Sequence, residues 1–243
     1  MTAILAAEWL RLRTTRGAWL LLAAAQLIIV LGVSGLMLRG DNLADPGVQQ
    51  QAVAHLGLVS LFTLVLGITA VAGEHRHRTV SDTYLAVPRR ARVVLAKLAV
   101  YTAAGLGFGL AAAISALSST AVWLTVRGET IQFDNTDLWR TVAGGIAWNA
   151  VFAALGVGVG ALITNQIGAI ATALAWLALI EGLVGQLIGD ARKWLPFALG
   201  SALDRLPTAT DGPAQWVAGL VLLGYAAAFT AAAVLTTTRR DVT

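Results

Sequence analysis

Residues 74–97 read EHRHRTVSDTYLAVPRRARVVLAK and separate two long apolar runs with a dense group of cations. An arginine at the centre of a bilayer costs about 2.5–3.5 kcal/mol on insertion scales, so this stretch is not expected to cross hydrocarbon. We therefore predict a loop between two membrane spans. Its positive charge indicates the cytoplasmic side of the membrane. The cations are Arg76, Arg78, Arg89, Arg90, Arg92 and Lys97, with His75 and His77 beside them.

The composition is typical of an integral membrane protein. Of the 243 residues, 57% are hydrophobic and 12% are charged, whereas soluble domains average about 25% charged residues. The sequence pI of about 10.1 would indicate nucleic-acid binding in a soluble protein. Here the basic residues cluster beside apolar runs, where they orient the chain and meet lipid headgroups, so we expect lipids and no nucleic acid as partners. The lack of cysteine excludes disulfides, thiolate metal sites and cysteine nucleophiles.

The apolar runs predict an all-α integral membrane protein, with one transmembrane domain over residues 1–243. The third run is longer than the roughly 20 residues that a bilayer requires, so its first turns, around Lys97, are expected to project from the membrane or to lie among the headgroups. The six predicted spans cover about 19–38, 53–72, 93–123, 142–163, 168–188 and 216–236, with a tight polar break at 164–166.

The distribution of Lys and Arg predicts the orientation. With six spans, the N-terminus, residues 74–97, residues 164–166 and the C-terminus share one side, and that side holds eleven Lys and Arg against six on the other. The positive-inside rule therefore predicts that both termini are cytoplasmic. The polar stretch 190–213 is then an extracytoplasmic loop. Within it, residues 194–203 are apolar but only half a span long, which favours a re-entrant or interfacial segment.

Residues 1–16 predict a short interfacial helix. Leu5, Trp9 and Leu12 fall at i, i+4 and i+7 and so share one helical face, with Arg11 and Arg13 around or beyond that stripe. Such a helix lies along the inner leaflet. The alternative is a signal peptide, but the apolar run that follows is longer than an h-region of about 7–15 residues.

Motifs for enzyme chemistry are absent from the sequence. There is no GxxxxGK[ST], HExxH or GxSxG, so we expect no catalytic residues and no ATP site in this chain. His75 and His77 resemble half of a metal site, but no further cluster completes it and the flanking arginines repel a cation, so no metal is expected. The pairs Gly105/Gly109 and Gly156/Gly160 have GxxxG spacing, which predicts close helix contacts without naming the partner helix.

Three residues at depth in the predicted spans are candidates for substrate contact or for a structural role. Glu181 is the one ionisable residue well inside a span. It is open to three interpretations: a hydrogen bond to the 190–213 loop, a substrate contact, or proton coupling. A second acid at depth, which a proton relay requires, is not evident. Trp148 and Asn149 lie at depth in the fourth span, where an amide usually bonds between helices.

Four segments together carry a resemblance to a known family. The segments are Glu8 to Arg16 (EWLRLRTTR), Gly73 to Val80 (GEHRHRTV), Pro88-Arg89-Arg90 with Lys97, and Asn165-Gln166 with Trp176 and Glu181. They resemble motifs of the ABC-2 type permease family, the membrane subunits of ATP-binding-cassette exporters, and above all its small actinobacterial members. Arg78 departs from the resemblance, since the family often has glycine there.

The resemblance implies a permease subunit of the bacterial cytoplasmic membrane. It implies a second permease subunit, identical or similar, and two copies of a separate ATPase that carries ATP and Mg. Residues 74–92 would be the cytoplasmic coupling segment, and within it residues 74–86 would be the coupling helix, pushed by ATPase closure. The alternative is a solvated lipid-binding face. Glu74→Ala is then expected to uncouple transport with little change in membrane level, whereas loss of folded protein would make Glu74 a structural cap. The implied coupling residues are Glu74, His75, Arg76, His77, Arg78, Thr79, Asp82, Tyr84, Pro88 and Arg89.

The sequence thus predicts a transport subunit rather than an enzyme. Spans rich in Ala, Leu, Val and Gly suit an amphipathic or hydrophobic small molecule as the exported substrate. Two other interpretations stay open: a self-contained secondary transporter, which would respond to a proton gradient, and a non-transporting membrane anchor or regulatory subunit.

Overall fold

The computed structural model describes residues 1–40, 42–77, 79, 85, 87, 89–205 and 212–239. Over these residues the chain is all-helical, without a strand. The main α-helices are α1 (Thr2–Thr14), α2 (Arg16–Arg39), α3 (Pro46–Val53), α4 (Ser60–Arg76), α6 (Arg90–Val126), α7 (Thr136–Leu162), α8 (Gln166–Ala175), α9 (Glu181–Leu187), α10 (Pro196–Leu203) and α11 (Gln215–Arg239). Short 3₁₀ segments cover Ala54–Val59 (η1) and Gly189–Trp194 (η3), and a π-helical turn covers Trp176–Ile180 (η2).

Six helical runs among the described residues are long and apolar enough to cross a membrane, which confirms the predicted number. The second run begins earlier than predicted, at Pro46, because Asp45 accepts a hydrogen bond from the Gly47 amide at 2.8 Å and proline occupies the first turn. The predicted break at 164–166 is confirmed, since Asn165 caps α8 through the Gly168 amide at 3.0 Å. The runs are Arg16–Arg39, Pro46–Arg76, Arg90–Val126, Thr136–Leu162, Gln166–Leu187 and Gln215–Thr236.

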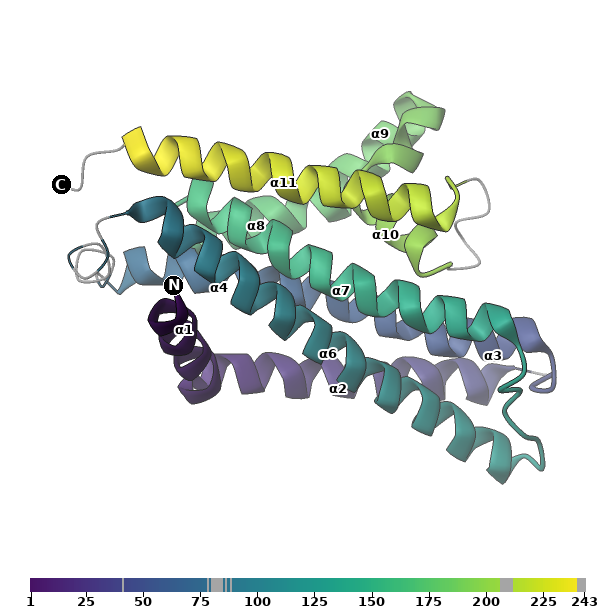
Figure 1. Ribbon diagram of the computed structural model, residues 1–243. Coiled ribbons are helices and arrows are strands. Elements are labelled where there is room, and N and C mark those ends of the chain that lie inside the picture. The colour runs from purple at the N-terminus through teal and green to yellow at the C-terminus, as the bar shows by residue number, and fades with distance from the viewer. Residues whose placement is uncertain are drawn as a thin grey trace.

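The long helices form a bundle whose two ends differ. The N-terminus and the end of α11 lie at one end of the bundle, where α1 runs across the start of α2 (Figure 1). We call this the terminal end; α3, the start of α7 and the end of α6 lie at the opposite end. α7 packs against α4, α6 and α11 and is the most buried of the six runs, whereas α8–α9 is the least buried.

Glycines let α7 approach its two main neighbours, and the structure names the partners that the sequence left open. On α6, a Cβ at Gly105 would lie 2.6 Å from the Asn149 carbonyl oxygen, and one at Gly109 would lie 2.8 Å from the Cα of Ile146. On α7, a Cβ at Gly156 would overlap the Leu64 carbonyl oxygen of α4. The first GxxxG pair therefore packs on α7 and the second packs on α4.

The predicted loop 190–213 is partly core. Residues 199–203 of α10 are buried, and α10 packs against α7 and α11. Proline at the first turn starts this helix after the extended Leu195. Within the apolar segment 194–203, Pro196–Leu203 therefore forms a helix that packs among the spans, in agreement with the predicted short segment that does not cross the membrane.

Gly156→Ala is predicted to lower the stability of the bundle by about 1–3 kcal/mol, because the added methyl group forces α4 away from α7. The matched control is Gly107→Ala on α6, where nothing lies within 4 Å of the added carbon. It should leave stability unchanged or raise it slightly, since alanine is the better helix former. Thermal unfolding of both variants in mild detergent checks the prediction, and equal midpoints would contradict it.

Candidate functional site

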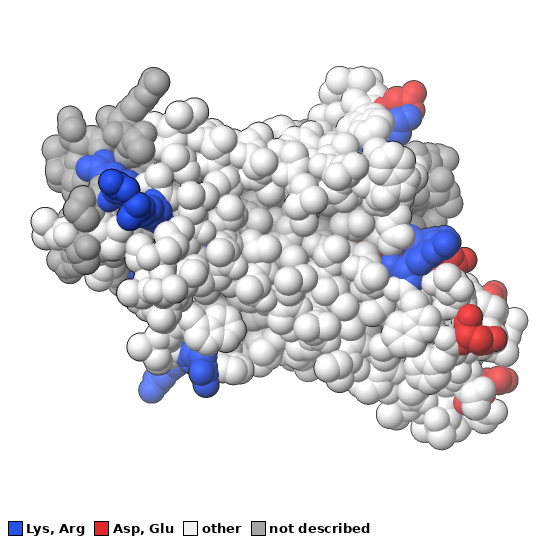
Figure 2. Space-filling model, viewed as in Figure 1, with Lys and Arg blue, Asp and Glu red and all other residues white. Residues whose placement is uncertain are grey.

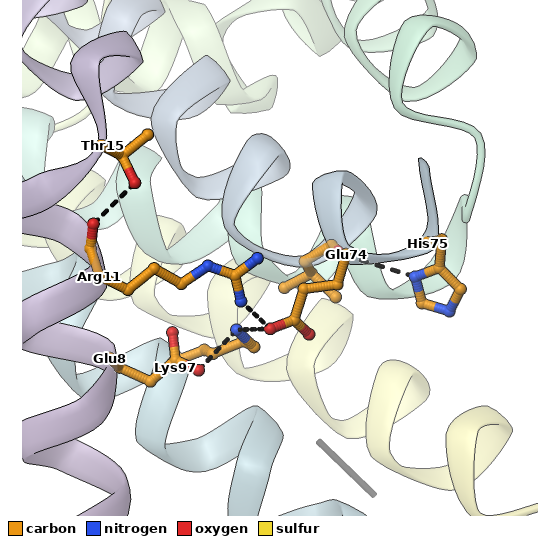
Figure 3. Close-up of polar contacts among 7 residues, drawn as sticks. Glu8, Arg11, Thr15, Glu74, His75 and Lys97 are labelled. Carbon is orange, nitrogen blue, oxygen red and sulfur yellow. Dashed lines mark hydrogen bonds and ion pairs between the residues drawn. The ribbon is translucent and has the colours of Figure 1, made fainter. Parts of the chain in front are cut away.

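Four charged side chains from three helices meet at the terminal end and form the candidate site (Figure 3). The Lys97 Nζ atom lies 2.7 Å from Glu8 Oε1 and 2.9 Å from Glu74 Oε1. Arg11 Nη1 donates to the same Glu74 oxygen. We call Glu8, Arg11, Glu74 and Lys97 the ion cluster. It connects α1 with the last turn of α4 and the first turns of α6.

Three of the four members of the ion cluster are withdrawn from water, whereas the Arg11 side chain is 38% exposed. Lys97 is 1% exposed, Glu74 is 3% exposed and Glu8 is 6% exposed. A buried charge is tolerated only with a partner, and removing one partner leaves an uncompensated charge. Two cations and two carboxylates balance, so the cluster as a whole is neutral. Its members therefore stay in place only while α1 lies on α4 and α6.

The spacing of residues on α1 explains how Glu8 and Arg11 reach the cluster. The face that α1 turns inward carries Leu5, Glu8, Arg11 and Leu12, three or four residues apart, and both leucines pack on the core. Trp9 is not part of this face, because its side chain is 46% exposed. The face that packs on the protein therefore contains two charged residues besides Leu5 and Leu12, and the predicted contact of Leu5, Trp9 and Leu12 with the inner leaflet stays a prediction.

The turn after α1 sets the angle between α1 and α2. Thr15 has an extended backbone, and both its amide and its hydroxyl group donate to the Arg11 carbonyl oxygen, at 3.0 and 2.7 Å. Arg11 thus accepts the hydrogen bonds of the residue that caps the end of α1, while its guanidinium group binds Glu74 (Figure 3). Trp19, at the start of α2, donates to the Arg13 carbonyl oxygen at 2.9 Å.

Glu74 is part of a span helix and not the start of a separate coupling helix, which corrects the predicted boundary. α4 continues through Glu74 and His75 to Arg76, and its C-cap is His77. The Glu74 carbonyl oxygen then accepts a hydrogen bond from the Thr79 amide at 3.0 Å. Glu74 is buried and binds two cations, so Glu74→Ala is expected to reduce the amount of folded protein. This is the outcome of a structural role rather than of uncoupled transport.

The other predicted coupling residues are exposed, half-buried or outside the described residues. Arg76, His77, Thr79 and Arg89 are exposed around the end of α4 and the start of α6, and so is Arg13 on α1. His75 is half-buried, with Nδ1 3.4 Å from the Val71 carbonyl oxygen. The remaining ones, Arg78, Asp82, Tyr84 and Pro88, lie outside the described residues.

Sequence reasoning missed the role of Glu8 and the burial of Lys97. Lys97 is covered by α1, and the position of its helical turns relative to the headgroups stays a prediction. A signal for Glu8 was present, because it lies three residues after Leu5 and four before Leu12, on the stripe that packs inward. A signal for Lys97 was also present, since a lysine inside an apolar helix requires an acid nearby. Which acid it meets could not be read from the sequence.

Glu181 serves a different part of the fold. Its carboxylate accepts hydrogen bonds from the Phe197 amide, at 2.9 and 3.1 Å, and from the Ala198 amide at 3.2 Å. These are the first free amides of α10, so Glu181 caps that helix with a negative charge at its positive end. This is the hydrogen bond to the 190–213 loop that the structural interpretation predicted.

Trp148 and Asn149 are fully buried in α7 and lie apart from the ion cluster, with Trp148 against α10 and Asn149 against η1 and α6. The Asn149 side-chain amide donates to the carbonyl oxygens of Gly145, at 2.8 Å, and Leu56, at 3.2 Å. The Trp148 ring meets Phe152 and Phe197 edge to face, with centroids 5.6 and 5.3 Å apart. Both side chains therefore hold α7 to its neighbours.

An apolar cavity of about 250 Å³ lies beside these aromatic residues. It is bounded by α4, α7, α11, the start of α10 and the π-helical turn η2. π-helical turns inside α-helices are frequent at functional sites. The cavity is lined by apolar side chains almost throughout, among them Leu64, Phe152, Leu155, Trp176, Pro196 and Phe229.

Lys97→Met is predicted to destabilise the protein by about 3–5 kcal/mol, because it leaves Glu8 and Glu74 buried without their shared cation. The matched control is Lys193→Met, which removes the other lysine of the chain. Lys193 lies 3.0 Å from an Asp190 that is 96% exposed, and such surface pairs contribute about 0–1 kcal/mol. Chemical unfolding in detergent compares the two variants. An equal loss of unfolding free energy in the two variants would contradict the prediction, because the buried lysine would then contribute no more than the exposed one.

No protein-family model matches this chain, and no curated protein matches it. Among the described residues, no three His, Asp or Glu side chains are grouped as metal ligands would be. The functional assignment therefore rests on the residues themselves.

Proposed function

We propose that this chain is the transmembrane permease subunit of an ATP-binding-cassette transporter of the ABC-2 type in the bacterial cytoplasmic membrane. A separate ATPase subunit, in two copies and holding ATP and Mg, drives it, and a second permease subunit completes the transporter. The ion cluster carries the proposal. It fixes α1, α4 and α6 to one another at the place where the segment between α4 and α6 begins and ends.

The ion cluster supplies what a mechanical coupling needs. A push on the segment after α4 acts on α4 and α6 directly, because these helices are continuous with its two ends. Through Lys97 and Arg11 the same push reaches α1, and through Thr15 it reaches α2. Helices joined by buried ion pairs are expected to shift together. Moving one helix alone would leave the charges of the others buried without a partner, which is costly.

The charge of the terminal end supports a cytoplasmic placement. Figure 2 shows blue without red at that end of the visible face, and red and blue together at the opposite end. The acids of the terminal end among the described residues, Glu8 and Glu74, are buried in the ion cluster, so the exposed charge there is basic. A basic end meets the cytoplasmic leaflet according to the positive-inside rule.

The apolar cavity supports the substrate class. It offers hydrocarbon-compatible walls between spans, so an amphipathic or hydrophobic small molecule is proposed as the exported substrate. A self-contained secondary transporter is the second candidate. One observation favours it: the carboxyl group of Asp204 is fully buried near the opposite end, a second acid that the sequence did not indicate.

Purification from the native membrane in mild detergent is expected to yield the chain with a stoichiometric soluble ATPase, two copies for two permease subunits. Arg76→Glu, on the exposed end of α4, should weaken this association because it reverses a charge beside the coupling segment. The control is Arg127→Glu, an equally exposed reversal at the opposite end, which should leave the association intact. Native mass and protein mass spectrometry measure both. A chain that purifies without any nucleotide-binding partner would overturn the proposal.

Single cysteines test the orientation, because the natural chain has none. Thr14→Cys lies at the terminal end and Glu129→Cys at the opposite end, and both residues are exposed. A membrane-impermeant maleimide added to intact cells is expected to label only the Glu129 variant, and opened cells should allow both to react. Labelling of the Thr14 variant in intact cells would place the ion cluster outside and remove the ATPase from its reach.

A further inference from the structure

Asp204 occupies a niche that only glycine neighbours permit. It follows α10 directly, its amide donates to the Gly200 carbonyl oxygen at 2.9 Å, and its side chain is 0% exposed. A Cβ at Gly57 of η1 would overlap one carboxyl oxygen, and a Cβ at Gly145 of α7 would lie 2.6 Å from the other. The same Cβ at Gly57 would also lie 2.7 Å from the ring of Trp148, so the indole borders this side of the carboxyl group. The carboxyl group thus packs closely against the backbone of η1 and α7 and lies beside the indole ring, without exposure to solvent.

Neither oxygen of Asp204 has a hydrogen-bond partner among the described residues. The neighbouring Trp148 Nε1 and Asn149 Oδ1 also lack one. An ionised carboxylate without a donor, a cation or water is very costly in such a place, and the group instead keeps its proton. Burial accordingly raises the pKa of Asp204 well above its ordinary value.

The charged groups on the surrounding elements bind elsewhere. Arg205, the next residue, has a left-handed backbone (φ 55°) and directs its guanidinium group to Asp137 on α7, at 2.9 Å. Arg140 of α7 lies 3.5 Å from the same Asp137. His55 of η1 bonds to the Gln51 and Ala52 carbonyl oxygens. α3 and α10 contain no ionisable side chain.

On α11, which packs against α10, the hydroxyl group of Tyr225 donates to the Trp194 carbonyl oxygen at 3.2 Å. No ion pair therefore joins Asp204 to any described neighbour, and a proton is the partner that its niche accommodates.

We propose that Asp204 is a proton-binding site that holds α10 in the bundle, and that loss of the proton releases α10 from η1 and α7. The charged form must reach water, and the buried side chain has no exposure to solvent, so the side chain and the helix that ends on it move outward together. α10 is held at its other end by Glu181, so release begins at Asp204.

The release has a consequence for the apolar cavity. Trp148 contacts Phe152 and Phe197, and Phe152 and Pro196 line the cavity wall. When α10 leaves Trp148, this aromatic wall loses its support, and the cavity opens toward the end of the bundle opposite the ion cluster. The site is thus a proton-controlled gate. It does not rest on the proposed ATPase, because neither a partner nor a substrate takes part in it.

The sign of the pH dependence follows from the raised pKa. The folded protein keeps the Asp204 proton at pH values where the unfolded chain has lost it. The proton therefore makes its full contribution to stability below the ordinary aspartate pKa of about 3.9. This contribution is lost as the pH rises from that value through the raised pKa of the folded state. One such proton changes the closed–open equilibrium by at most about tenfold per pH unit.

Cysteine labelling of α10 tests the gate. Ala202→Cys is buried on α10, and Glu129→Cys, exposed at the same end, corrects for the pH dependence of the thiol itself. The ratio of the two labelling rates is expected to rise several-fold from about pH 5 to about pH 8. With Asp204→Asn added, which is the same size and holds no charge, the ratio should stay constant. Asp190→Asn, an exposed acid, should leave the rise intact.

Two results would overturn the gate. One is a ratio that stays constant in the chain with natural Asp204. The other is a ratio that rises equally in Asp204→Asn, since another group would then be responsible. Asp204→Leu, which also cannot ionise, replaces the asparagine variant should that variant not fold.

Discussion

A single buried ammonium group determines how the terminal end is arranged. Lys97 lies inside the protein between Glu8 and Glu74, and Arg11 shares the Glu74 oxygen. None of these charges can be desolvated alone, so the positions of α1, α4 and α6 are fixed together. This constraint makes α1 a part of the bundle rather than a helix attached only to lipid. It also explains why the exposed charge of this end is basic, since its described acids are used inside.

The remainder of the fold is arranged around α7, through contacts that need no charge. Gly105 and Gly109 of α6 and Gly156 of α7 bring backbones close enough for direct packing on both sides of this helix. At the opposite end, α10 packs on Trp148, and an acidic side chain lies at each end of this helix. Glu181 is satisfied by the amides of Phe197 and Ala198, whereas Asp204 has no donor. The bundle therefore has a fixed end at the ion cluster and a titratable end at α10.

The sequence predicted what depends on local pattern and missed what depends on distant contact. The number of apolar helices, the break at Asn165 and the close packing of the GxxxG pairs follow from residues near one another in the chain, and the structure confirms them. The union of Glu8 with Lys97 joins residues 89 positions apart, which no periodicity encodes. The sequence assigns Asp204 to a loop because the residue lies in the polar stretch 190–213 beside Arg205; only the fold shows that it follows α10 into the core.

We propose above all that the ion cluster moves α1, α4 and α6 as one unit when the proposed ATPase acts. Hydrogen–deuterium exchange of the purified transporter, with and without a non-hydrolysable nucleotide, tests it most directly. The account predicts that exchange changes together in α1, in the last turn of α4 and in the first turns of α6. A change confined to one of these three segments, or confined to the opposite end of the bundle, would contradict it.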